Sequence, residues 1–177
     1  MGEIKSTLDL VLEKTKHLSQ TSEEKQAQKQ KEIENRLNGM LQKYQDGLYS
    51  LEQLRQDYQE LKTDFKLPDN TTLAGQVINR LDPGADNLAM FDVLEHCCEM
   101  DYSGLADVIN EYQTGHHAAA QSRMETLKAG LAKKYSISGS AVVPNLELDD
   151  RWHLEAKALA SVAEQKIDQE KERLIDS

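Results

Sequence analysis

Three residues of the type that metal ions prefer as ligands, Asp92, His96 and Glu99, stand at helical spacing in the sequence. Positions i, i+4 and i+7 fall on one side of an α-helix, so the two carboxylates and the imidazole would face the same way. Further along the chain, His153 follows Asp149 by four residues and repeats the pairing. A helical bundle could gather such groups into a carboxylate and histidine site of the di-iron kind.

The same residues have a plainer interpretation as a solvated acidic surface. A di-metal carboxylate bundle uses Glu-x-x-His on two helices, and this sequence contains no Glu-x-x-His. The usual nucleotide-binding, hydrolase, zinc and calcium-loop motifs are absent as well. We therefore expect no enzyme activity, no cofactor and no metal. A metal-dependent helical-bundle enzyme or metal-binding protein using Asp92, His96, Glu99 and His153 is the alternative.

Charge separates the two parts of the chain and narrows the class of partner. The net charge is −10, with 11 basic and 12 acidic residues in 1–66 but 10 basic and 19 acidic residues in 67–177. Between Leu67 and Glu111, Arg80 is the only basic residue against nine acidic ones. Such a field repels phosphate backbones and anionic lipid, so we expect a protein partner or self-association, with no nucleic acid and no membrane.

The two cysteines, Cys97 and Cys98, are adjacent and make no disulfide framework, which favours a reducing, cytoplasmic setting. The chain carries no apolar stretch of the length that a membrane span requires. Small buried side chains are the usual role of such cysteines.

A narrow apolar seam carries the strongest structural signal. Leu51, Leu54, Tyr58, Leu61 and Phe65 alternate three and four apart through otherwise charged sequence, which is typical of a helix that packs against other helices. We expect the last four of these residues to bind a partner.

Helix signals recur along the whole chain and predict an all-α fold. An amphipathic helix is expected over 3–18, and a helical hairpin over 22–66, with Asp46-Gly47 as the stop between its two long helices. Thr21 stands three residues before Glu24, and Ser50 three before Gln53, so both are predicted to begin a helix. Shorter helices follow, including one that Gly115 closes and another over 116–135.

These elements predict four regions, which are residues 1–66 with the N-terminal helix and hairpin, an acidic bundle of short helices over 67–135, an extended connector over 136–149, and a C-terminal helix over 150–177. We expect Asp150 to cap the last helix, and the helix to pack back on the hairpin. The apolar face of this helix is predicted to consist of Trp152, Ala156, Leu159, Ala163, Ile167 and Leu174.

One short pattern occurs twice in the sequence. Leu41-x-x-Tyr44-Gln45-x-Gly47 and Ile109-x-x-Tyr112-Gln113-x-Gly115 lie 68 residues apart, without a matching segment between them. We interpret them as two helices that glycine ends in the same way, rather than as a solenoid repeat. The sequence thus predicts a cytoplasmic protein-interaction or assembly component that acts through amphipathic helix seams, able to form oligomers, with coiled-coil character.

Overall fold

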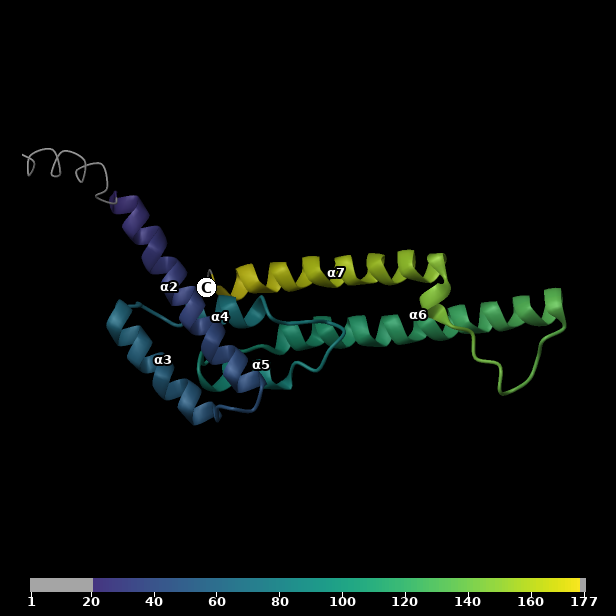
Figure 1. Ribbon diagram of the computed structural model, residues 1–177, viewed down its shortest axis with the longest axis horizontal. Coiled ribbons are helices and arrows are strands. Elements are labelled where there is room, and N and C mark those ends of the chain that lie inside the picture. The colour runs from purple at the N-terminus through teal and green to yellow at the C-terminus, as the bar shows by residue number, and fades with distance from the viewer. Residues whose placement is uncertain (1–20, 176–177) are drawn as a thin grey trace, which may run out of the picture. The chain divides into compact units, whose positions relative to one another are not determined.

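The computed structural model describes residues 21–175, and in this range the chain is all-α with no β-strand (Figure 1). The expected fold class is therefore confirmed, whereas the helix predicted over 3–18 lies outside the described residues. The helices are α2 (Ser22–Gln45), α3 (Leu51–Phe65), α4 (Thr71–Ile78), α5 (Leu88–His96), α6 (Ser103–Tyr135) and α7 (Asp150–Ile175), with a short 3-10 helix, η1 (Leu146–Leu148), before α7.

The chain divides after Lys66 into two compact units. Unit 1 contains α2 and α3, and unit 2 contains α4 to α7. The expected return of the last helix to the hairpin concerns the relation between these units and stays a prediction.

In unit 1, α2 and α3 pack against each other as a hairpin, and both begin with the signals present in the sequence. The Thr21 hydroxyl accepts a hydrogen bond from the Glu24 N–H at 3.2 Å, and the Glu24 carboxylate accepts one from the Thr21 N–H at 2.8 Å. Ser50 and Gln53 form the same reciprocal pair at the start of α3. These capping boxes satisfy N–H groups that a helix start leaves without partners.

In unit 2, α6 and α7 run antiparallel side by side, and α4 packs on α7 (Figure 1). The side-chain amide oxygen of Asn79, just after α4, accepts a hydrogen bond from the Lys171 ammonium at 2.5 Å near the C-terminal end of α7. Helix α5 packs on α4 and so lies toward this same end. The other end of α6 continues beyond the first turn of α7, where the connector returns.

The prediction that Gly115 ends a helix was wrong, because α6 continues through it to Tyr135. Gly47 does end a helix, and its φ of +70° is the left-handed conformation that glycine adopts at little cost. Two copies of one pattern therefore have different backbones. Residues after Gly115 include three alanines and further good helix formers, whereas Gly47 is followed by a turn and a new capping box.

The connector is non-helical from Ile137 to Asn145, as expected, but residues 146–148 of the predicted extended segment form the 3-10 helix η1. The residue that caps α7 is Asp149 rather than the predicted Asp150, because the Asp149 carboxylate accepts a hydrogen bond from the Trp152 N–H at 2.8 Å. A carboxylate one residue before the helix can accept a hydrogen bond from the N–H of the third helical residue. A carboxylate on the first helical residue is not placed to do so.

Candidate interaction surface

The first three metal-ligand candidates, Asp92, His96 and Glu99, do not share one helix. Helix α5 ends at His96, and Glu99 lies beyond it with a φ of +58°. The Asp92 and His96 side chains are one turn apart, but the His96 ring bonds the Asp92 backbone carbonyl at 3.0 Å. Glu99 therefore does not share a helix face with Asp92 and His96, because the helix ends before it.

The fourth candidate, His153, lies in the first turn of α7, where its Nε2 atom is 2.8 Å from the Glu147 carbonyl oxygen. At 1.5 Å per residue, His153 lies about 27 Å along α7 from Lys171. Lys171 contacts Asn79 at the end of α7 where α4 packs, so His153 is at the opposite end of the helix. Across residues 21–175, the structure holds no group of three or more His, Cys, Asp or Glu side chains arranged to bind a metal ion. The structure thus does not bring the four candidates together.

Three of the four expected partner-binding residues are buried. The exposed fractions are 1% for Leu54, 0% for Tyr58 and 1% for Leu61. On α2, the apolar residues Ile33, Leu37 and Leu41 are buried as well. The seam therefore contributes to packing within the chain, and a partner would reach these side chains only if they first unpacked.

The fourth residue, Phe65, is half-buried at the end of α3 and has two basic neighbours from α2. The Arg36 guanidinium lies 5.1 Å from the centre of the Phe65 ring, and the Lys29 ammonium lies 5.9 Å from it. Lys29 also donates a hydrogen bond to the Phe65 carbonyl at 2.9 Å. These cation–π and capping contacts hold the two ends of the hairpin together.

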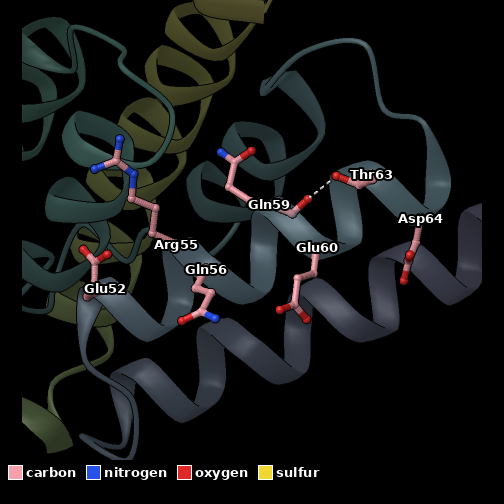
Figure 2. Close-up of a pocket in the computed structure, with 7 residues that line it drawn as sticks. All are labelled: Glu52, Arg55, Gln56, Gln59, Glu60, Thr63 and Asp64. Atoms are coloured by element: carbon pink, nitrogen blue, oxygen red, sulfur yellow. Dashed lines mark hydrogen bonds between the residues drawn. The ribbon is translucent and has the colours of Figure 1, made fainter.

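The outer side of α3 carries a shallow polar groove of about 660 Å³ (Figure 2). Arg55 and Gln59 point to one side of the helix, whereas Gln56, Glu60 and Asp64 point to the other. The side chains do not converge on a common point, and the groove contains no histidine, cysteine or serine. Its one hydroxyl, that of Thr63, donates a hydrogen bond to the Gln59 carbonyl at 2.9 Å. We interpret it as the solvated face of an amphipathic helix.

Unit 2 carries most of the exposed apolar side chains. Eight large apolar residues are exposed within the described range, and six of them lie between residues 135 and 162. The most exposed is Leu148 at 84%, followed by Val143 at 74% and Leu154 at 71%. The remaining three are Tyr135, Ile137 and Val162. They follow the last turn of α6, the connector, η1 and the first half of α7, and we call this set the apolar surface.

A small groove between α6 and α7 adjoins this surface. It has a volume of about 200 Å³, and Val108 and Tyr112 line it from α6 while Leu159 and Val162 line it from α7. At its edge the Lys166 ammonium lies 2.6 Å from the Glu111 carboxylate. An apolar floor with a charged rim is the usual layout of a protein-binding surface.

A polar hub fixes the start of α7 on α6 beside the apolar surface. Asp149 accepts two hydrogen bonds from the Arg123 guanidinium, at 3.0 and 2.7 Å. These bonds, together with the one from the Trp152 N–H, lower the pKa of the Asp149 carboxyl. The Trp152 ring meets the His116 ring edge-on, with centroids 5.0 Å apart. The segment that carries Leu148 and Leu154, on either side of this hub, is therefore held in place by these contacts.

Sequence reasoning missed the apolar surface, although it identified the inner face of α7 correctly. Trp152, Ala163 and Ile167 are buried as the periodicity predicts. The signal for the outer face was weaker, because the residues that follow Leu154 on that face are Ala158, Ser161 and Gln165. The connector residues showed no helical period, so nothing indicated which of them would be exposed.

No family model matches the chain, and neither a curated protein nor a solved structure matches it. Within residues 21–175, no helix combines the length and the apolar character needed to cross a membrane.

Proposed function

We propose that this chain is a protein-interaction or assembly component with no catalytic activity of its own, and that its binding surface is the apolar surface of unit 2. The supporting observation is the concentration of exposed apolar residues between positions 135 and 162. Clusters of exposed apolar side chains on folded proteins mark binding surfaces, and six such residues between positions 135 and 162 support an interface here. The buried Leu54, Tyr58 and Leu61 have a structural role instead, so the proposed surface differs from the one that the seam predicted.

We also propose a cytoplasmic setting, because Cys97 and Cys98 are free thiols. No observation favours the metal-dependent alternative, since its four ligand candidates do not converge.

Site-specific photocrosslinking tests the proposed surface. A photoreactive phenylalanine analogue replaces Leu148 in one variant and Gln59, on the polar side of α3, in a control. In cells of the source organism, we expect a discrete crosslinked protein from position 148 and none from position 59. Adding Val143→Asp, which places a charge within the surface, should abolish the crosslink while the helical circular dichroism stays unchanged. Equal crosslinking at both positions, or a crosslink that survives Val143→Asp, would contradict the proposal.

A further inference from the structure

Helix α7 has a second, outward face that the packing of unit 2 leaves exposed. The inward face holds Trp152, Ala163 and Ile167. On the opposite side, four uncharged residues follow one another at spacings of four, three and four, and all of them are exposed. They are Leu154, Ala158, Ser161 and Gln165. This spacing is the one by which two helices lie along each other in a coiled coil.

Two pairs of opposite charges on α7 are placed symmetrically about the middle of this face. Lys157 and Glu164 flank the face on one edge, seven residues apart, and both are exposed. Arg151 and Asp168 stand at its two ends, also exposed. When two copies of α7 lie antiparallel with their centres together, Lys157 of each copy faces Glu164 of the other. Arg151 of each copy likewise meets Asp168 of the other.

A groove beside α7 makes the acidic half of this pattern accessible. It has a volume of about 520 Å³ and lies between α7 and the loop that follows α4. Three carboxylates line it, those of Asp82, Glu164 and Asp168, and no basic side chain does. The basic residues that would complement this groove, Arg151 and Lys157, are on the other half of the same helix. In a two-fold arrangement each copy supplies them to its partner.

We propose that the outward face of α7 binds α7 of a second copy of this chain, as an antiparallel two-fold dimer. The inference rests on the proposed function and assigns part of its surface to self-association. A second copy is the favoured occupant because Arg151 and Lys157, on one half of α7, have their charge complements, Asp168 and Glu164, on the other half. A parallel pairing would bring Asp150 of one copy against Glu155 of the other, so charge also selects the orientation.

Charge exchange tests this inference on the full chain. Sedimentation equilibrium over a range of protein concentrations gives the dimer dissociation constant. We expect Lys157→Glu alone, or Glu164→Lys alone, to weaken the dimer by about tenfold or more, because each variant sets like charges against each other twice. The double variant Lys157→Glu with Glu164→Lys restores both pairs in reverse, so its dissociation constant should return to within about threefold of the original.

Two further samples sharpen the result. An equimolar mixture of the two single variants should form a heterodimer. The Lys157→Glu chain carries two acidic groups on this edge, and the Glu164→Lys chain carries two basic groups. Lys128→Glu and Glu125→Lys, both exposed on α6, change the net charge equally and should leave the dimer intact.

A wild-type chain that stays monomeric at all concentrations, or a dimer that the single variants leave unchanged, would overturn the inference. The proposed function fails separately, since it depends on the crosslink at position 148. A monomeric chain that still crosslinks to a foreign protein would retain the proposed function and lose the dimer.

Discussion

The Arg123 guanidinium on α6 holds the Asp149 carboxylate through two hydrogen bonds, and Asp149 in turn caps α7. One carboxylate therefore anchors the end of the connector and orders the first turn of the last helix. The paired groups are mostly shielded, with exposed side-chain fractions of 17% and 14%. Because the connector between α6 and α7 is non-helical, this contact decides where α7 begins.

Replacing Asp149 by Asn should lower the melting temperature by several degrees. Asparagine can still cap the helix, but it loses the charge-assisted pair with Arg123. Thermal unfolding followed by circular dichroism measures the change. Asp150→Asn, one residue on, is the matched control and should have little effect. If the two variants melted alike, the pair of Asp149 with Arg123 would contribute nothing measurable to stability.

The stability that Asp149 contributes should depend on pH. The hydrogen bonds from Arg123 and from the Trp152 N–H lower its pKa below the ordinary value of 3.8. A carboxyl group whose pKa is lower in the folded state stabilises the fold above its unfolded pKa, and this contribution is lost as the pH falls through the folded value. The difference in melting temperature between wild type and Asp149→Asn should be constant from about pH 5 to 8 and should shrink below about pH 4. A difference that grew in acid would contradict this.

The two glycines of the repeated pattern should respond to alanine in opposite ways. Gly115 lies inside α6, and a Cβ atom there would meet no heavy atom within 4 Å. Gly115→Ala should therefore stabilise unit 2 by about 0.5–1 kcal/mol. Gly47 has a φ of +70°, so Gly47→Ala should destabilise unit 1 by about 1 kcal/mol. Chemical unfolding of both variants gives the two signs, and equal signs would refute the assignment.

Leu61 tests whether the seam of α3 is structural. Its side chain is 1% exposed, so Leu61→Ala should cost about 2–5 kcal/mol of unfolding free energy. Gln59→Ala, on the exposed polar side of the same helix, should change it by less than about 0.5 kcal/mol. Urea titration measures both. A Leu61→Ala variant as stable as Gln59→Ala would show that the seam does not pack in solution.

The buried thiols should be inert in the folded chain. Burial, with a smaller contribution from Cys97, raises the pKa of the Cys98 thiol to about 12. Because the thiolate is the reactive form, Cys98 should not react with a disulfide reagent at pH 8. Cys97 is buried as well and should also be protected, whereas both should react in guanidinium chloride. A cysteine introduced by Leu148→Cys, at a position 84% exposed, is the positive control. Rapid labelling of Cys98 in the folded chain would contradict its burial.

The sequence alone was sufficient for the helices that carry complete local signals. Capping boxes at Thr21 and Ser50, the glycine stop at Gly47 and the three-four spacing in α3 act over a few residues, and the structure agrees with each. The inner face of α7 was also predictable from the sequence, because Trp152, Ala163 and Ile167 recur at the helical period. Local backbone preferences and periodicity decide such features without help from distant residues.

The spacing of residues did not determine where two helices end. Gly115 stays inside a helix, with good helix formers after it, although it stands in the same pattern as Gly47, and Glu99 leaves the helix that would have aligned it with Asp92. Tertiary structure decided which helix faces stay exposed. The apolar surface and the outward face of α7 depend on which residues other helices cover. Exposure is a property of packing between segments distant in sequence, so local spacing predicts a helix and its faces but not which face stays exposed.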